Sequence, residues 1–313
     1  MSGLLRQVPI VCPGHTRPLS ELQFTFHPSD GLFLMSACHD KAPMLRRGST
    51  GDWIGTFQGH KGAVWSAKLD PTAERAATAS GDFTAAVWDA ITGAQLVSFQ
   101  HKHIVRSIEF SPCGSMVATG GHEGVCRIFD LKSGATTPVH EFKAPGPTAN
   151  INKVCWGSDP SRSSLVFCGA SDGAVKVWDI RSGLVAHSMS VSGHVMDMEL
   201  SEGSLQQLTV SAGTAVTFFD VRSFQAIKSF EMPVHFRDEG GASLHPSGTK
   251  FIAGGSDLWV RVFDAENGKE LECHKGHHGP IRCMRYTPDG TAYATGSEDG
   301  TIRIWKTDLA ASE

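Results

Sequence analysis

The chain has 313 residues, of which 40% are hydrophobic and 19% charged, a mix that excludes wholesale disorder. The formal net charge of -4 at pH 7, together with the lack of a long basic run, disfavours nucleic-acid binding driven by net charge. No apolar stretch reaches the roughly 18 residues of a membrane helix, and the N-terminal segment is too polar for a secretory signal. We therefore expect no membrane insertion and no direct contact with DNA.

The eight cysteines are scattered without a CxxC pair. Most of them lie in apolar stretches, as Cys126 and Cys168 do. This pattern favours reduced, buried thiols over a disulfide framework and is typical of a cytoplasmic protein that can also be nuclear.

A repeated phrase runs through the chain: an acidic residue, alternating β-rich residues, an aromatic residue and then Asp. Clear copies are DFTAAVWDA from Asp82, DGAVKVWDI from Asp172, DLWVRVFDA from Asp257 and DGTIRIWKT from Asp299. The aromatic residue or its equivalent recurs at intervals of 41 to 49 residues. The seven anchor positions are Arg46, Trp88, Phe129, Trp178, Phe219, Phe263 and Trp305.

A second marker, His, lies 28 residues before the anchor in four copies, at His60, His101, His235 and His277. A period in the forties with alternating strands and turn residues is typical of a propeller blade with four strands. The sequence therefore predicts an all-β, seven-bladed β-propeller as a single domain over residues 1–313. Residues 1–12 are expected to supply the strand that completes blade seven, because residues 306–313 are too few for one.

The GH and WD signatures resemble the WD-repeat family, whose fold is a ring of four-stranded sheets around a central channel. In that family the marker His, a hydroxyl residue, the turn Asp and the Trp form a buried hydrogen-bonded tetrad. A buried indole N–H needs an acceptor, and these side chains can satisfy one another. The resemblance implies two complete tetrads: His60, Thr78, Asp82 and Trp88 in copy two, and His277, Thr295, Asp299 and Trp305 in copy seven.

The other copies depart from this pattern. Copy one is eroded, copy three carries Phe129, and copy six lacks the hydroxyl at Ala253. Copy five has neither the His nor the Asp, so we expect apolar packing to hold blade five. Copy four is longer and predicts a protruding loop that includes Pro138 and Pro145.

Longer segments resemble one branch of WD-repeat proteins, the serine/threonine kinase receptor-associated protein family, also called the Unr-interacting protein family. The segments are GDWIGTFQGHKGAVWSAKLD, HKHIVRSIEF, SFEMP and CHKGHHGPIRCMRYTPDGTAYATGSEDGTIRIW. The resemblance implies a non-enzymatic scaffold linked to spliceosomal ribonucleoprotein assembly through the survival-of-motor-neuron complex, to an RNA-binding cold-shock protein and to receptor-kinase signalling. Contacts with RNA would pass through partner proteins, and the chain alone is expected to be a monomer. Members carry an acidic extension after the last blade, so contacts through such a tail are not expected here.

Two alternatives remain open. Subunit I of translation initiation factor three is another seven-bladed propeller and shares features such as GHKGAVW. The boxes at 178–181 and 219–222 also resemble the WDxR boxes of substrate receptors for cullin ubiquitin ligases, although an Arg at a strand end is ordinarily a solvated residue.

No catalytic constellation is present in the sequence: it has no phosphate-binding loop, no nucleophile elbow and no HExxH motif. The densest His/Cys tract, 273–283, contains the tetrad residue His277 and the inner-strand residue Cys283, so we expect no metal site. No cofactor is expected either. Ser49 follows two arginines and resembles a kinase site on an exposed loop.

The predicted binding surface is the narrow face around the channel mouth. Its positions flank the first apolar residue after each marker, where Trp, Arg and Met are typical interface residues. The alternative for Trp65 is a core position. The candidate residues are Pro18, Ser20, Ala63, Trp65, Arg106, Asn152, His194, Met196 and Arg282.

Overall fold

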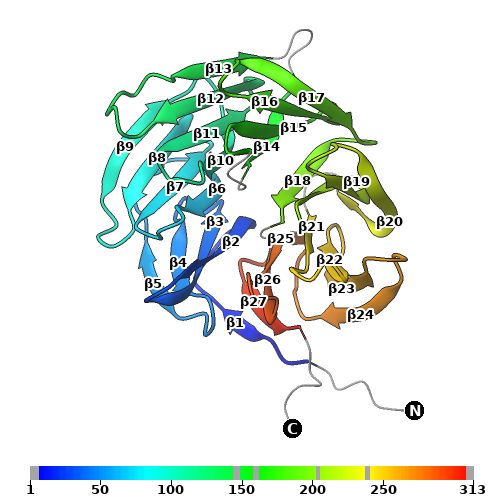
Figure 1. Cartoon of the computed structure of the whole chain (residues 1–313). Coiled ribbons are helices and arrows are strands. Elements are labelled where there is room, and N and C mark those ends of the chain that lie inside the picture. The colour runs from blue at the N-terminus through cyan, green and yellow to red at the C-terminus, as the bar shows by residue number, and fades with distance from the viewer. Residues whose placement is uncertain (1–6, 144–148, 158–161, 202–204, 237–239, 308–313) are drawn as a thin grey trace, which may run out of the picture.

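In the computed structural model, seven antiparallel sheets stand around a central axis and form a closed ring (Figure 1). The structure describes residues 7–143, 149–157, 162–201, 205–236 and 240–307. The predicted seven-bladed β-propeller is confirmed. Arg6, the loop residues Pro145–Pro147 and the tail from 308 onward lie outside the described residues.

The strands follow the same order in each blade, from the channel outward. The innermost strands are β2 (Leu19–His27), β6 (Val64–Leu69), β10 (Val105–Phe110), β14 (Ile151–Trp156), β18 (Val195–Leu200), β21 (Gly241–Leu244) and β25 (Ile281–Tyr286). The second strands are β3 (Gly31–Cys38), β7 (Arg75–Ser80), β11 (Met116–Gly121), β15 (Leu165–Ala170), β22 (Lys250–Gly254) and β26 (Ala292–Ser297). The third strands are β4 (Met44–Arg47), β8 (Thr84–Asp89), β12 (Val125–Asp130), β16 (Ala174–Asp179), β23 (Trp259–Asp264) and β27 (Ile302–Lys306). The outermost strands are β5 (Trp53–Thr56), β9 (Gln95–Gln100), β13 (His140–Lys143), β17 (Leu184–Ser190), β20 (Ala226–Phe236), β24 (Glu270–Lys275) and β1 (Ile10–Cys12).

Blade five departs from this plan. Its second and third strands are one continuous strand, β19 (Gln207–Asp220), which pairs with β18 through its first half and with β20 through its second. The two halves meet at Gly213, whose φ of 59° is a conformation that glycine adopts without strain. Buried apolar residues from both halves of β19, including Val210 and Phe218, fill the cores on the two sides of the blade.

The hydrophobic cores lie between blades. In β8, Ala86 and Trp88 pack into a cluster shared with blade one, whereas Ala85 and Val87 pack into a cluster shared with blade three. This alternation follows from the two-residue period of a β-strand, which turns successive side chains to opposite faces of the sheet. Among the described residues, one such cluster fills each interface between neighbouring blades.

The N-terminal strand closes the ring. Strand β1 pairs with β27 in antiparallel register, with Ile10 opposite Ile304 and Cys12 opposite Ile302. The Gln7 amide extends this pairing: its Nε2 donates to the Lys306 carbonyl oxygen at 2.8 Å, and its Oε1 accepts the Lys306 N–H at 2.9 Å. Blade seven is therefore built from both ends of the chain, as the sequence predicts.

All eight cysteines lie in the described residues and are free; six are buried, while Cys113 and Cys273 are exposed. Among the residues that the structure describes, no helix has the length and apolar character needed to cross a bilayer.

Candidate protein-binding site at the channel mouth

Four side chains join the loop, the sheet and the turn of blade two. His60 lies 2.8 Å from Asp82 through Nδ1 and 2.7 Å from Thr78 through Nε2, and Trp88 Nε1 donates to Thr78 Oγ1 at 2.8 Å. Burial opposes ionisation of Asp82, but hydrogen bonds from His60, Thr84 and the Lys61 N–H outweigh it and hold the pKa of Asp82 below its usual range.

Blade seven repeats this arrangement. His277 lies 3.1 Å from Asp299 and 2.9 Å from Thr295, and Trp305 Nε1 donates to Thr295 Oγ1 at 2.9 Å. In both blades the histidine fixes the loop before the innermost strand to the turn between the second and third strands. These hydrogen bonds thereby hold the loops of the propeller face in place at these two blades.

Blade one retains part of the tetrad, although its sequence suggests an eroded copy. His15 lies 2.8 Å from both Asp40 and Ser36. Arg46 replaces the Trp, is only 3% exposed and donates to the Gly51 and Pro13 carbonyl oxygens. The signal for this set is Ser36, which stands at the hydroxyl position ten residues before Arg46.

Blades three and six use a different arrangement. In blade three His101 lies 3.0 Å from Thr119, but the turn acid Glu123 binds Arg127 at 2.7 Å. In blade six the turn acid Asp257 binds Arg261 at 2.6 Å, four residues on, as in blade three.

The interpretation of His235 as a tetrad marker is wrong. The outermost strand β20 continues through this residue, so its side chain is exposed, and its backbone N–H donates to Ser256 Oγ at 3.3 Å.

Within the described residues, His15, Cys38 and Asp40 bring three possible metal-ligand atoms within 4.8 Å of one another. Each is already engaged: His15 in the tetrad, and the Cys38 thiol as a donor to the Arg17 carbonyl oxygen at 3.1 Å. Burial raises the pKa of Cys38 to about 12, so the thiol is protonated at neutral pH. We therefore interpret His15 and Asp40 as members of the blade-one tetrad and Cys38 as a neighbouring thiol.

The predicted mouth residues share one backbone feature. In six blades the innermost strand opens with a break in register, and the extra residue at each break is a predicted one. A β-bulge leaves its extra residue unpaired and redirects the side chain. These six residues are Ser20, Trp65, Arg106, Asn152, Met196 and Arg282.

All six line one cavity of about 50 Å³ at the mouth of the channel. The Arg106 guanidinium stacks on Trp65, with Cζ 3.8 Å from the ring centroid, and His39 meets the same indole edge-on at 4.2 Å. Trp65 is partly exposed, because it forms the wall of the cavity. Arg282 lies across the mouth, 3.5 Å from Glu298.

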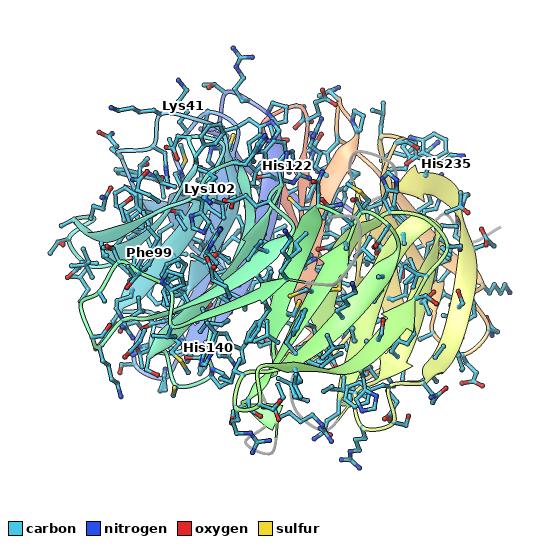
Figure 2. The ribbon with its side chains drawn as sticks, turned by 90° about the horizontal axis from the view of Figure 1, so that it is seen from above. Lys41, Phe99, Lys102, His122, His140 and His235 are labelled. Carbon is cyan, nitrogen blue, oxygen red and sulfur yellow. The ribbon has the colours of Figure 1, made fainter. Side chains whose placement is uncertain are left out.

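Pro18, Ala63 and His194 precede the bulged residues and do not line the cavity; His194 is fully on the surface, whereas Pro18 and Ala63 are half-buried. The same face carries the turns with Lys41 and His122 and the end of β20 with His235, which Figure 2 shows along one rim of the ring, with His140 at the other.

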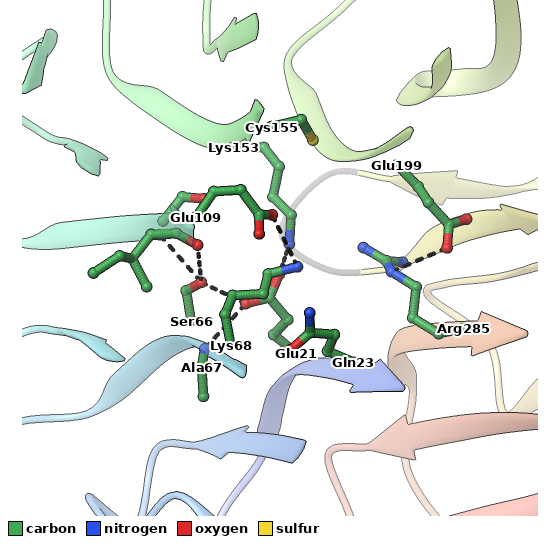
Figure 3. Close-up of polar contacts among 12 residues, drawn as sticks. Glu21, Gln23, Ser66, Ala67, Lys68, Glu109, Lys153, Cys155, Glu199 and Arg285 are labelled. Carbon is green, nitrogen blue, oxygen red and sulfur yellow. Dashed lines mark hydrogen bonds and ion pairs between the residues drawn. The ribbon is translucent and has the colours of Figure 1, made fainter. Parts of the chain in front are cut away.

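A charged network closes the channel below the mouth (Figure 3). Lys153 of blade four reaches across to bind Glu21 of blade one, and Lys68 lies 3.3 Å from both Glu21 and Glu109. Arg285 of blade seven donates to the Asp197 carboxylate of blade five at 2.7 and 2.8 Å. These residues were not predicted from the sequence, although each is a charged residue among the apolar residues of an innermost strand.

The acidic residues of the network differ in the direction of their pKa shifts. Burial opposes ionisation of Glu21, but Lys153, Lys68 and the Ser66 hydroxyl lower the pKa of Glu21 to about 2. Burial raises the pKa of Glu109 and of Glu199. Burial also opposes ionisation of Asp197, but Arg285 and Lys153 lower its pKa, so Glu21 and Asp197 are the two acids that the network holds ionised.

Polar side chains also join the innermost strands of neighbouring blades. Glu21 accepts the Ala67 N–H, Gln23 accepts the Leu69 N–H at 2.6 Å, and the Ser107 hydroxyl accepts the Val154 N–H at 2.9 Å. These bonds satisfy backbone groups on the channel side of the strands, which would otherwise be unpaired. The mouth thus sits on a rigid support.

The two WDxR boxes lie on the opposite face, in turns after the third strands. Arg181 is 74% exposed and bound to its own Asp179 at 3.0 Å, and Arg222 Nε donates to Gln206 Oε1 at 2.8 Å. Ser49 is exposed in a turn, but Arg46 of the same motif is buried.

Comparison with known proteins agrees with this architecture. The WD domain, G-beta repeat model matches residues 51–89, 93–130, 136–179 and 268–306, slightly more than half of the chain. The serine-threonine kinase receptor-associated protein of Dictyostelium discoideum is 45% identical over 95% of this chain and 98% of its own length. The proteins of that name from Gallus gallus and Homo sapiens are 44% and 43% identical over 97% of this chain, and 84% and 83% of theirs.

The chain belongs to the serine-threonine kinase receptor-associated protein family. Members of this family are named for association with a kinase receptor, and the name describes no reaction. Subunit I of eukaryotic translation initiation factor 3 from Drosophila sechellia is also similar, at 28% identity over 95% of both chains. Its lower identity favours the kinase receptor-associated family over that alternative.

Proposed function

We propose that this chain is a protein-interaction scaffold that binds its partners at the channel mouth. The observation that carries the proposal is the convergence of six bulged residues from six blades on one cavity. A partner that reaches this point contacts most of the ring at once. Trp and Arg, which stack here as Trp65 and Arg106, are the residue types most enriched at binding hot spots.

The family name suggests one class of partner, a receptor serine-threonine kinase. The family resemblance suggests a second class, the proteins that assemble spliceosomal ribonucleoproteins, with RNA contacted only through them. We therefore propose a cytoplasmic location that extends to the nucleus. The eight free cysteines support this location, because thiols stay reduced in these compartments.

The test is affinity purification from a native lysate with mass spectrometry. Wild type is compared with Trp65→Ala and with Arg106→Ala/Arg282→Ala. The matched control, Arg181→Ala/Arg222→Ala, removes two arginines from the opposite face. Loss of a hot-spot residue typically lowers affinity about thirtyfold or more, so the mouth variants should lose partners that the control retains, with similar melting temperatures.

Equal recovery by all variants would place binding elsewhere on the ring. Partners lost only from the control would favour the cullin-ligase reading of the WDxR boxes. Recovery of translation initiation factor subunits in place of receptor or ribonucleoprotein components would favour a role in translation initiation.

A further inference from the structure

Two groups of rings and guanidinium side chains lie on the face of the mouth: His39 and Arg106 contact Trp65, and His103 lies between His122 and Phe83. Beyond the Trp65–Arg106 stack, His122 lies 5.2 Å from His103, and His103 lies 5.4 Å from Phe83, between ring centroids. We call this set the aromatic row: Arg282, His39, Trp65, Arg106, His122, His103 and Phe83.

The charges of Arg282 and Arg106 act on two histidines of the row. Burial, followed by the charges of Arg282 and Arg106, lowers the pKa of His39 to about 4. Burial and the charge of Arg106 likewise lower the pKa of His122. These two half-buried histidines are thus uncharged at neutral pH, whereas Arg106 and Arg282 carry positive charge at the mouth.

Phe83 sits at the outer end in an unfavourable backbone conformation. Its φ is 70°, at a turn position where blades three, four and seven carry Gly124, Gly173 and Gly300 with φ of 65°, 83° and 78°. A bulky side chain disfavours this left-handed region, and Phe83 gains little from burial because it is 42% exposed. Strain of this kind is typical of functional positions.

The cavity at the inner end has an excess of positive charge. Its lining includes four cations, Lys153, Arg106, Arg282 and Arg285, against two carboxylates. Both carboxylates are already bound, Glu21 by Lys153 and Asp197 by Arg285. A volume of about 50 Å³ is far below the roughly 300 Å³ of a small-molecule pocket. The cavity therefore suits one small anionic group at the end of a side chain.

We propose that the mouth receives an Asp or Glu carboxylate of an extended partner segment, and that an apolar side chain of that segment packs on Phe83 and His103. The inference rests on the proposed function, because it names the chemistry of a partner at the same mouth. Guanidinium groups are suited to carboxylates because they donate in a planar, bidentate geometry. An exposed aromatic ring supplies apolar contact area at low entropic cost.

The test begins with selection of short random peptides displayed on phage. The immobilised proteins are wild type, Arg106→Gln/Arg282→Gln, Phe83→Gly and the opposite-face control Arg181→Gln/Arg222→Gln. Wild type and control should enrich peptides with Asp or Glu at a fixed spacing from an apolar residue. The mouth variant should lose the acidic preference, and Phe83→Gly, which also relieves the strain, should lose the apolar one.

A labelled synthetic copy of the selected peptide then gives affinities by fluorescence anisotropy. Replacing its acidic residue by Gln or Asn should weaken binding to wild type at least tenfold, and added salt should weaken binding of the acidic peptide more than that of its amide copy. These two measurements need no protein variant, so they hold even where a mouth substitution disturbs the fold.

Selection of peptides without a fixed acidic residue, or no enrichment by wild type, would overturn the inference. Tighter binding of a phosphoserine copy would replace the carboxylate by a phosphate. If lysate partners are lost from the mouth variants while the peptides show no acidic preference, the inference fails and the proposed function stands. If the variants retain their lysate partners, the proposed function itself fails.

Discussion

At the scale of single residues, the indole hydrogen bonds of blades two and seven are fully buried polar contacts. Trp88 and Trp305 are each 1% exposed, and their N–H groups donate to threonines that are fully buried. A buried donor or acceptor that loses its partner costs the free energy of its desolvation. The tetrads therefore contribute to stability through the cost of removing any one member.

Trp88→Phe and Trp305→Phe should each lower the free energy of unfolding by about 1–3 kcal/mol. The matched control is Trp53→Phe: Trp53 also donates to a threonine hydroxyl, at 3.0 Å, but is 61% exposed. Water can replace that bond, so the control should change stability by less than about 0.5 kcal/mol. Urea unfolding measures all three variants, and equal effects at Trp53 and Trp88 would contradict the argument. Phe129→Trp should bring no comparable gain.

Residue-scale prediction from the sequence succeeded where a marker recurs at fixed spacing. The tetrad residues of blades two and seven stand at the same intervals from their anchors and are found bonded to one another. The partial tetrad of blade one was not predicted, because Arg46 replaces the aromatic anchor. His235 matched the spacing by coincidence, because spacing alone does not reveal that β20, with 11 residues, extends through that position.

At the scale of elements, the short strand β1 has a role out of proportion to its length. It covers the outer edge of β27, which would otherwise present unpaired backbone N–H and C=O groups. Its Cys12 also packs in the core between blades seven and one, together with Ile302. The strand therefore contributes both edge pairing and burial.

Deletion of residues 1–12 should cause aggregation or a loss of cooperative unfolding, because it exposes the edge of β27. Deletion of residues 1–6 is the control, because it leaves Gln7 and β1 in place. Light scattering and thermal melts compare the two truncations with the full chain. A soluble 1–12 deletion with the melting temperature of the control would show that β1 is dispensable.

The strands themselves were predictable because alternation and turn residues are local signals. The β-bulges that redirect the mouth residues cannot be predicted from one sequence. Ser20, Trp65 and Arg106 have different chemistry, and only their shared place after the marker His indicates a common position. The position of each residue within its repeat therefore predicts which residues lie at the mouth. The geometry of the mouth depends on the folded structure.

At the scale of the whole molecule, the charged network joins blades that are far apart in the chain. Glu21 and Lys153 are separated by 132 residues, and Asp197 and Arg285 by 88. A repeat analysis compares equivalent positions and carries no information on which of them meet across the axis. The network was for this reason beyond prediction from the sequence, even though each charge is visible in it.

Glu21→Gln should destabilise the ring on the order of 3–5 kcal/mol at neutral pH, because it leaves buried lysines without their anion. The pKa of Glu21 is about 2 in the folded ring and about 4.3 in an unfolded chain. Its ionisation therefore stabilises the fold above pH ~4.3, and this contribution is lost as the pH falls toward 2. The stability difference between wild type and variant should shrink over that window in urea unfolding measured at successive pH values.

For Glu109→Gln we expect the stability difference from wild type to change with pH in the opposite direction. Burial raises the pKa of Glu109 in the folded ring, so its protonated form is favoured there. Wild type should gain stability relative to this variant as the pH falls through the raised pKa. Differences that move in the same direction for the two variants would contradict the division of charge in the channel.

The pairing of β1 with β27 has a consequence for how the protein is made. A ribosome adds about 5–20 residues per second, and Cys12 must wait for Ile302, an interval on the order of 15–60 s at that pace. Blades one to six can assemble during synthesis, but blade seven cannot be finished until β27 has been made. During that interval the growing chain is an open arc whose N-terminal strand is unpaired. Until β27 is made, the N-terminal strand presents unpaired backbone groups that can pair with another chain.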